Sequence, residues 1–312
     1  MLKPLVADPT EFGKVAVAMG GSSAEREISL RSGEAVMAAL KRKNVDAEGV
    51  DIANDPIAAL SGKNYDRVFN IVHGRGGEDG VLQGVLQAMG LPCTGSGVAG
   101  SAIGMDKLKT KLCWLGLGLP TPRWLVLRDE QNFQQCEQEL GFPFIVKPAQ
   151  EGSSIGMSKV TGATELVRAR EVAAGHGSAV FAEQWVDGTE YTAGFLGDLA
   201  LPLVRLETPN SFYDFDAKYR SDSTCYHCPC GLDGGFEKQI QELAGRACAG
   251  LSVTGWGRVD LLIDELKKPW LIEVNTVPGM TDHSLVPMAA SALGIGFDDL
   301  VWRILETSME TD

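Results

Sequence analysis

Residues 14–97 alternate twice between an apolar strand-like run, a glycine-rich turn and an amphipathic helix. The first unit passes from "KVAVAMGG" into "EREISLRSGEAVMAALKRK", in which Ile28, Val36 and Leu40 recur at helical spacing. The second passes from "RVFNIV" through "HGRGGEDG" into "VLQGVLQAMG". Units of this kind build an open, mostly parallel sheet whose ligand crevice lies at the carboxyl ends of the strands. The chain is therefore predicted to begin with an α/β domain whose two glycine turns line a crevice.

The remaining chain divides into two blocks that mix helices and strands without this alternation. Residues 98–183 contain the helical run "MDKLKTKLCWLGLG", the connection "LPTPRW", the strand "FPFIVKP" and the loop "EGSSIGMSKV". Residues 184–312 contain several strands, a polar aromatic stretch and an apolar hairpin. A length of 312 residues suggests two or three domains. We predict domains at residues 1–97, 98–183 and 184–312, with 1–13 as a flexible arm of the first.

Composition limits the partners and the compartment. The formal net charge is −13, so the overall field repels nucleic acid and anionic lipid, and neither is expected as a partner. No apolar run reaches the roughly eighteen residues of a membrane span, and the first apolar stretch is too short and wrongly flanked for a signal peptide. The seven cysteines are odd in number and scattered, which fits a reducing compartment. A cytoplasmic protein without a membrane partner is expected.

The segment "GRVDLLIDELKKPWLIEVN", residues 257–275, carries charged groups inside two apolar strands. With "ELKK" as the hairpin loop, Asp260 faces Glu273 and Arg258 faces Asn275. Two carboxylates about 5 Å apart on one face repel each other, so the pair needs a cation or a shared proton. The alternate positions are expected to pack on the opposite face: Val259, Leu261, Ile272 and Val274.

Carboxylate and amide oxygens suit a hard cation, and Mg²⁺ held by few protein ligands completes its shell with nucleotide phosphates. The facing pairs therefore predict a magnesium clamp. The alternative is a solvated hairpin whose polar face happens to be acidic.

Three lysines are candidates for binding phosphate. Lys147 ends a strand just before "PAQEGSSIGMS", where Gly152 and Gly156 would let backbone N–H groups approach an anion. Lys107 and Lys218 are further sources of positive charge. Each lysine taken alone is better explained as a solvated surface group, and the loop gains weight only beside the acidic hairpin.

The stretch "FAEQWVDGTE" could hold an adenine, which needs a flat apolar slot with hydrogen bonds at its edge. Taken alone, this stretch favours an ordinary strand end with surface acids. The candidates for the base and the ribose hydroxyls are Glu183, Gln184, Trp185, Val186 and Glu190.

Eight motifs in the same order and at compatible spacing resemble the D-alanine–D-alanine ligases of the ATP-grasp superfamily. The match runs from about residue 14 to the end of the chain. The motifs are "GGSSAEREISL", "HGRGGEDG", "TGSG", "MDKLKTK", "KPAQEGSSIGMSKV", "FYDFDAKY", "GWGRVD" and "EVNTVPGMTDHSLVP". The resemblance implies an α/β ATP-grasp fold, in which an N-terminal parallel-sheet domain is followed by two α+β domains that clasp ATP.

The resemblance also implies a reaction. Such ligases phosphorylate one D-alanine with ATP and let the amine of a second attack the D-alanyl phosphate, which gives the dipeptide, ADP and phosphate for peptidoglycan synthesis. The implied cofactors are ATP and two Mg²⁺ ions, for which Mn²⁺ can substitute, and a homodimer is expected. Two alternatives stay open: another ATP-grasp ligase, including one that makes D-alanyl-D-lactate, and a nucleotide-binding module without catalysis.

By resemblance, each motif residue receives a role. The metal ligands are Asp260, Glu273 and Asn275, and the phosphate oxygens meet Lys107, Lys147 and Lys218. Arg258 and the backbone N–H of Gly279 face the developing oxyanion. His73 lies near the carboxylate of the first D-alanine, while Ser284 and Lys218 bind the carboxylate of the second.

Glu25 has two interpretations. "SSAE" has the spacing of a helix capping box with Ser22 as the cap, and from the residues alone this explanation is preferred. The resemblance instead assigns Glu25 to the ammonium group of the first D-alanine, linked through Ser153 to Tyr219. A loop at 207–224 would then close over ATP and exclude water.

The stretch "CYHCPC" departs from the family pattern. Cys225, His227, Cys228 and Cys230 crowd into six positions, which invites a zinc site. Since the chain has no second "CxxC" pair, reduced cysteines beside the closing loop are the favoured interpretation.

Overall fold

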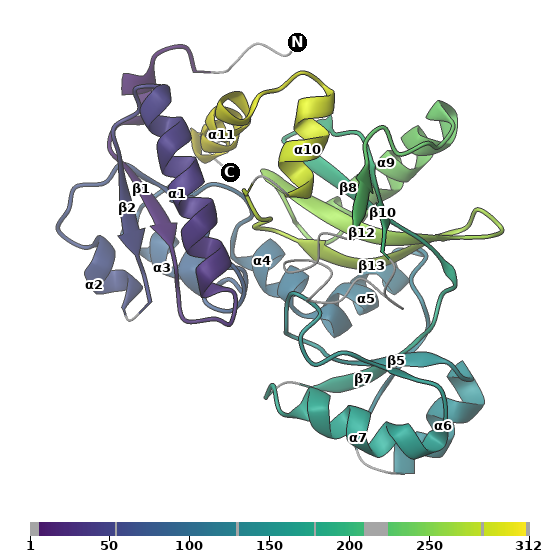
Figure 1. Ribbon diagram of the computed structural model, residues 1–312. Helices are drawn as coiled ribbons and strands as arrows, with labels where there is room; N and C mark the ends of the chain where they lie inside the picture. The colour runs from purple at the N-terminus through teal and green to yellow at the C-terminus, as the bar shows by residue number, and fades with distance from the viewer. Residues whose placement is uncertain are drawn as a thin grey trace.

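The computed structural model describes residues 6–53, 55–128, 131–177, 179–208, 224–281 and 284–309. Within these ranges the chain forms three sheets (Figure 1). The first is parallel and the other two are antiparallel. The predicted α/β architecture, a parallel-sheet domain followed by two α+β units, is confirmed. The division at residues 97 and 183 stays a prediction.

The N-terminal sheet has the order β2–β1–β3. Its elements are β1 (Val15–Met19), α1 (Arg26–Arg42), β2 (Ala47–Asp51), α2 (Pro56–Leu60), β3 (Arg67–Asn70) and α3 (Val81–Met89). Side chains of β1 alternate between two cores, so that Val17 packs with α1 while Ala18 packs with α3. The sheet is therefore covered on both faces, as the near-continuous apolar strands require.

The prediction of a flexible arm is wrong for residues 6–13. A short 3₁₀-helix, η1 (Pro9–Phe12), packs Phe12 fully out of solvent and edge-on against Trp302, with ring centroids 4.9 Å apart. The backbone N–H of Val6 donates to Oε1 of Glu306 at 3.0 Å. Two apolar side chains in "MLKPLVADPTEFG" thus anchor this segment to the last helix.

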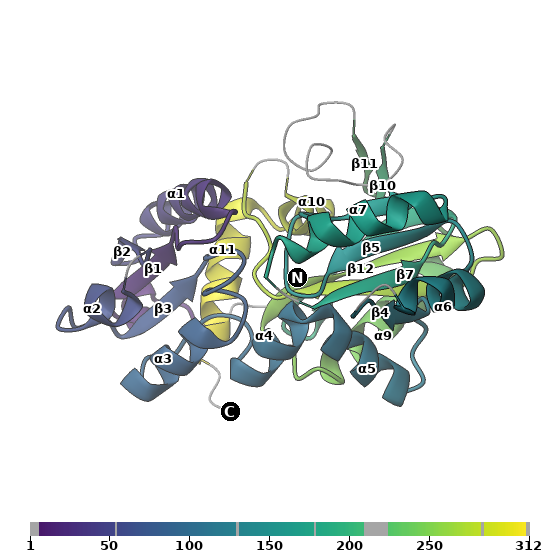
Figure 2. The ribbon, with the colours of Figure 1, turned by 90° about the horizontal axis from the view of Figure 1, so that it is seen from below.

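The central sheet has the order β4–β7–β5–β6. Its elements are β4 (Trp124–Val126), α6 (Gln131–Leu140), β5 (Phe144–Pro148), β6 (Ser158–Val160), α7 (Ala163–Ala174) and β7 (Val180–Gln184). Leu166 of α7 and Cys136 of α6 pack with Phe144 and Val146 in one core, so both helices cover the same face. The other face lies toward the C-terminal sheet (Figure 2).

The C-terminal sheet has the order β11–β10–β8–β12–β13, with β9 paired to β8. Its strands are β8 (Gly188–Leu196), β9 (Leu199–Ala200), β10 (Val204–Glu207), β11 (Cys225–His227), β12 (Trp256–Asp264) and β13 (Pro269–Asn275). Helix α9 (Gly234–Ala249) and helix α5 (Lys107–Gly116) pack on one face through Ile240 and Trp114. Part of the opposite face is left for the central sheet.

The helical run at 105–118 begins as a new helix rather than continuing the one before it. Helix α4 (Val98–Met105) ends at Met105 and α5 starts at Lys107. The intervening Asp106 has an extended backbone, and its carboxylate accepts hydrogen bonds from the N–H groups of Leu108 and Lys109. Asp106 is therefore the N-cap of α5, and the break places Lys107 in its first turn.

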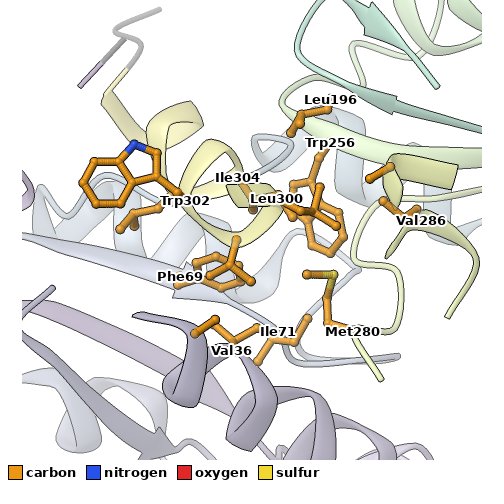
Figure 3. Close-up of a cluster of buried hydrophobic side chains, with 14 of the residues drawn as sticks. Val36, Phe69, Ile71, Leu196, Trp256, Met280, Val286, Leu300, Trp302 and Ile304 are labelled. Atoms are coloured by element: carbon orange, nitrogen blue, oxygen red, sulfur yellow. The ribbon is translucent and has the colours of Figure 1, made fainter. Parts of the chain in front are cut away.

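Helices α10 (Leu285–Ala292) and α11 (Phe297–Glu306) join the N-terminal sheet to the C-terminal sheet. Figure 3 shows the shared core, where Phe69 and Ile71 lie beside Met280, and Leu300 of α11 lies near Trp256. Arg42 of α1 also pairs with Asp298 of α11. A short 3₁₀-helix, η2 (Thr307–Met309), follows.

The hairpin register predicted from the sequence is confirmed at its polar end. Arg258 pairs with Asn275 and Asp260 pairs with Glu273, and the loop between the strands is 265–268. Beyond Asp260 the register shifts, because Leu261 pairs with Leu271 and leaves Ile272 as an extra residue. The prediction that Ile272 packs on the far face is therefore wrong: this bulge puts Ile272 on the same side as Glu273.

Among the described residues no single helix is long and apolar enough to cross a membrane. One pair of helices, Leu285–Ala292 and Phe297–Met309, meets the length and composition test together, but it is bent by 106°.

Candidate active site

A cavity of about 490 Å³ lies between the central and C-terminal sheets. Lys147 of β5 and Asp260 and Glu273 of the hairpin line it, together with the apolar Leu262 and Ile272. The residues predicted to hold adenine and ribose all line the same cavity: Glu183, Gln184, Trp185, Val186 and Glu190. They do so because β7 runs through a three-residue connection directly into β8, which carries the chain from one sheet to the other.

Glu183 lies between two lysines at the base of this cavity. Its carboxylate forms ion pairs with Lys147 and with Lys111, both buried. Burial alone would raise the pKa of Glu183, but the two lysine charges outweigh it and hold the pKa below its usual range. The sequence marked Glu183 and Lys147 separately, but not their contact.

Lys111 is the member of this cluster that the sequence did not single out. Its ammonium group donates to Oγ1 of Thr121 at 2.5 Å, and that hydroxyl donates to the carbonyl oxygen of Leu271 at 2.9 Å. Burial lowers the pKa of Lys111 to about 8. Lys111 therefore connects the central sheet to β13 beside the bulge. Its spacing of four from Lys107, which puts both on one side of a helix, was the feature of the sequence that could have identified it.

A smaller cavity of about 40 Å³ adjoins the first and shares Glu273 with it. It collects residues from all three predicted domains: Glu25, Ser153, Lys107, Arg258 and Asn275. The hydroxyl of Ser153 donates to the Glu25 carboxylate. The backbone closes tightly around that carboxylate, because a Cβ on Gly74 or Gly152 would lie within 2.7 Å of Oε2 of Glu25.

The capping-box interpretation of "SSAE" is wrong. Helix α1 begins at Arg26 with Glu25 at the N-cap position, and no side chain caps it. The carboxylate of Glu25 instead points into the small cavity. The hydroxyl of Ser23 accepts the N–H of Glu25 and donates to the carbonyl oxygen of His73.

Each hairpin carboxylate is next to a cation of the chain. Lys107 lies 3.1 Å from Glu273, and Arg258 lies 3.2 Å from Asp260. The hydroxyl of Thr192 on β8 also donates to Asp260 at 2.5 Å. Two facing carboxylates with an amide nearby fit the oxygen-rich donor set of Mg²⁺, which needs few protein ligands.

His73 is buried, and protein groups meet both of its ring nitrogens. Nδ1 lies 2.8 Å from the carbonyl oxygen of Val277, and Nε2 lies 3.2 Å from Oγ of Ser32. Burial lowers the pKa of His73, which favours the neutral ring. Ser32 also accepts the N–H of Met280, so it ties the histidine to the loop after β13.

That loop carries Gly279 next to Ser284. A Cβ on Gly279 would lie 3.0 Å from Oγ of Ser284. Oγ of Ser284 accepts the N–H of Thr281 at 2.8 Å. The structure thus places these two predicted residues together, after the strand that bears Glu273 and Asn275.

Glu78 is a further acidic group in the small cavity. Its Oε1 accepts the N–H of Gly74 at 2.9 Å. Burial, and next the charge of Glu25, raise the pKa of Glu78 well above its usual range. Its place in "HGRGGEDG" was the available signal.

Two predicted site residues, Lys218 and Tyr219, lie outside the described residues, as does most of the predicted closing loop at 207–224. In the neighbouring "CYHCPC" stretch, Nε2 of His227 lies 3.0 Å from Oε2 of Glu207. Cys225 is exposed and Cys230 is buried. Among the described residues no group of three or more His, Cys, Asp or Glu side chains could hold a metal ion.

Comparisons with known proteins cover nearly the whole chain. A model described as the D-ala D-ala ligase C-terminus matches residues 113–306. A D-alanine–D-alanine ligase of Methylococcus capsulatus is 64% identical over 303 residues, which are 97% of this chain and 98% of that protein.

Two solved structures have the same fold. The D-alanine–D-alanine ligase from Bacillus anthracis complexed with ATP is 29% identical with a TM-score of 0.83, over 95% of this chain and 97% of that one. The VanG D-Ala:D-Ser ligase from Enterococcus faecalis is 28% identical with a TM-score of 0.83, over 95% and 99%.

Proposed function

The chain belongs to the D-alanine–D-alanine ligase family, and from this premise we propose that it joins two D-alanines at the expense of ATP. The observation that best supports the proposal is the meeting of two cavities at Glu273. One cavity has the size for a nucleotide, and the other is smaller and lined by carboxylates and cations that suit the two charges of an amino acid. A carboxylate activated in the small cavity would therefore lie next to the phosphate donor.

We assign the large cavity to ATP. Leu262 and Ile272 offer an apolar surface for the base, while Glu183 to Val186 and Glu190 supply hydrogen-bonding groups at its edge. Lys147 and Lys107 would neutralise phosphate oxygens. When bound, Mg²⁺ would be held by Asp260, Glu273 and Asn275 and would supply positive charge against the phosphates.

We assign the small cavity to the first D-alanine. Glu25 would hold its ammonium group, and His73 would lie toward its carboxylate. An oxygen of that carboxylate attacks the γ-phosphorus of ATP, the bond to the bridging oxygen breaks, and ADP leaves with the electron pair. The product is D-alanyl phosphate, which has the leaving group that a free carboxylate lacks.

The second D-alanine then attacks as a free amine. Its nitrogen forms a bond to the acyl carbon, and the carbonyl oxygen takes up negative charge that Arg258 and the Gly279 N–H would stabilise. Phosphate leaves as the carbonyl re-forms, and the nitrogen loses a proton. Ser284 and Lys218 would hold the carboxylate of this second substrate, and Tyr219 would complete the link through Ser153 to Glu25.

The remaining assignments of the proposal are a homodimer, a need for two Mg²⁺ ions, a role in peptidoglycan precursor synthesis, and domains at 1–97, 98–183 and 184–312. Neither nucleic acid nor a membrane is proposed as a partner. Family membership supports the first four assignments, and the negative net charge of the chain supports the last.

The deciding experiment measures ADP and dipeptide together, with D-alanine, D-serine, D-lactate and L-alanine as substrates and with or without Mg²⁺. We expect D-alanyl-D-alanine and ADP in equal amounts, only when Mg²⁺ is present. The D-serine arm is included because a D-Ala:D-Ser ligase shares the fold. Turnover that ignores D-alanine would overturn the proposal.

A further inference from the structure

Arg75 lies in the loop between β3 and α3, and hydrogen bonds within this loop hold the backbone on both sides of it. The N–H of Gly74 donates to Glu78 at 2.9 Å, and the N–H of Gly76 donates to Asp79 at 2.8 Å. Gly74 and Gly76 have φ angles of 71° and 86°, a region that favours glycine. These two turns flank Arg75 and direct the chain on either side of it.

From this loop Arg75 reaches the central sheet. Its Nη2 donates to the carbonyl oxygen of His176 at 3.0 Å and lies 2.9 Å from Oε1 of Glu151. Its Nε donates to the carbonyl oxygen of Gln150 at 3.3 Å. The Glu151 side chain is 17% exposed and that of Arg75 is 43% exposed, so the ion pair is shielded from water on the Glu151 side only.

Two of the groups that Arg75 contacts, on Gln150 and Glu151, begin the glycine and serine loop, residues 150–157, and the third, on His176, follows α7 (Ala163–Ala174). Glu151 directly precedes the Gly152–Ser153 pair that touches Glu25, and its carbonyl oxygen accepts Nζ of Lys107 at 2.6 Å. At the far end the ring of His176 packs against Gly156, where a Cβ would lie 2.6 Å from Cδ2. The guanidinium group thus restrains the start of the loop directly and its far end through His176.

We propose that Arg75 is a positioning residue that latches the central sheet to the N-terminal domain, so that Ser153 stays on Glu25 while the acyl phosphate exists. The inference rests on the proposed function. Arg75 contacts no reacting atom. It acts by holding the 150–157 loop against the small cavity and keeping water out.

Loss of the latch has a defined chemical consequence. A water oxygen attacks the acyl carbon of D-alanyl phosphate, phosphate leaves with the electron pair, and D-alanine is regenerated. The net reaction is ATP hydrolysis to ADP and phosphate without dipeptide. The ratio of ADP to dipeptide therefore reports the latch directly.

The test compares Arg75→Ala with Arg42→Ala. Arg42 is a matched control, because it also makes two hydrogen bonds to protein oxygens, on Asp298, and lines neither cavity. We expect Arg75→Ala to raise the KM for D-alanine about tenfold, because small misplacements in a site of this kind are costly. We also expect more ADP than dipeptide from it, and a ratio of one from Arg42→Ala.

A conservative variant separates positioning from folding. Arg75→Lys keeps a charge for Glu151 but loses the fork that reaches both carbonyl oxygens, so it should recover part of the coupling ratio and of the KM. Hydrogen exchange of residues 149–157 without substrates should be faster in Arg75→Ala than in the wild type, and unchanged in Arg42→Ala.

The inference would be overturned if hydrogen exchange of residues 149–157 in Arg75→Ala were as slow as in the wild type. It would also be overturned if the variant had an ADP-to-dipeptide ratio of one and an unchanged KM for D-alanine. If the wild type itself makes no dipeptide, the proposed function fails instead, and the exchange measurement still decides whether Arg75 restrains the loop.

Discussion

The Lys107 ammonium group lies 3.1 Å from the Glu273 carboxylate, so a proposed phosphate ligand neutralises a proposed metal ligand. The pairing explains how two carboxylates can face each other across the hairpin, since Arg258 does the same for Asp260. When ATP and Mg²⁺ bind, both cations would exchange a carboxylate for phosphate or acyl oxygens. Before they bind, Lys107 and Arg258 balance the charges of the two carboxylates.

Glu273→Gln should lower turnover by orders of magnitude and leave the fold intact. The amide keeps the size of the side chain but loses the charge that a hard cation requires. Turnover at rising Mg²⁺ and the thermal unfolding midpoint measure the two effects. Glu265→Gln, in the exposed hairpin loop, is the matched control. Near-normal turnover of Glu273→Gln at saturating Mg²⁺ would show that the carboxylate is not a required ligand.

The bulge at Ile272 makes opposite predictions for two neighbouring residues. Leu271 is fully buried in the core, so Leu271→Ala should lower the free energy of unfolding by about 2–5 kcal/mol. Ile272→Ala should cost less stability and instead raise the KM for ATP, because Ile272 lines the nucleotide cavity. Regular strand alternation predicts the reverse, so urea unfolding and ATP kinetics of both variants decide between them.

Lys111→Met should destabilise the protein although Lys111 is not assigned to a substrate. The change leaves buried Glu183 with one lysine in place of two and removes the donor to Thr121. Breaking a buried ion pair costs about 3 kcal/mol or more. Lys109→Met, at an exposed position two residues away, should change stability by less than about 0.5 kcal/mol. Equal unfolding midpoints for the two variants would contradict the role of Lys111.

Glu78 should make the protein less stable as the pH rises. Its folded pKa is raised above the usual value of 4.5, so its contribution is fully present below that value and is lost as the pH rises through the folded pKa. Glu78→Gln keeps an oxygen for the Gly74 N–H and cannot titrate. Urea unfolding between pH 5 and 8 should show a smaller loss of stability for the variant. Parallel pH profiles would mean that Glu78 ionises normally.

Local periodicity was sufficient to predict much of the fold. The spacing of apolar residues gave the N-terminal strand and helix units, and the two polar pairs of the hairpin gave its register and its loop at 265–268. Both depend on neighbours along one strand or helix, which the sequence records directly. The bulge at Ile272 could not be predicted in this way, because one extra apolar residue in an apolar strand does not change the local sequence pattern.

Contacts between distant segments could not be predicted in the same way. Glu25 has the spacing of a cap but turns to Ser153, 128 positions along the chain. The Lys111–Glu183 pair likewise joins distant segments of the chain, and the Arg75 contacts join two of the predicted domains. Motifs marked several of these residues as candidates, but their partners depend on how the three sheets meet.

The packing of α11 on the N-terminal sheet constrains how the protein matures on the ribosome. Leu300 and Trp302 close the core that Phe12 and Val17 begin, yet they are synthesised long after them. The first domain emerges early with an open apolar face and cannot cover that face fully until α11 has left the exit tunnel. A chain that stops before residue 297 would therefore leave an apolar face of the N-terminal domain uncovered.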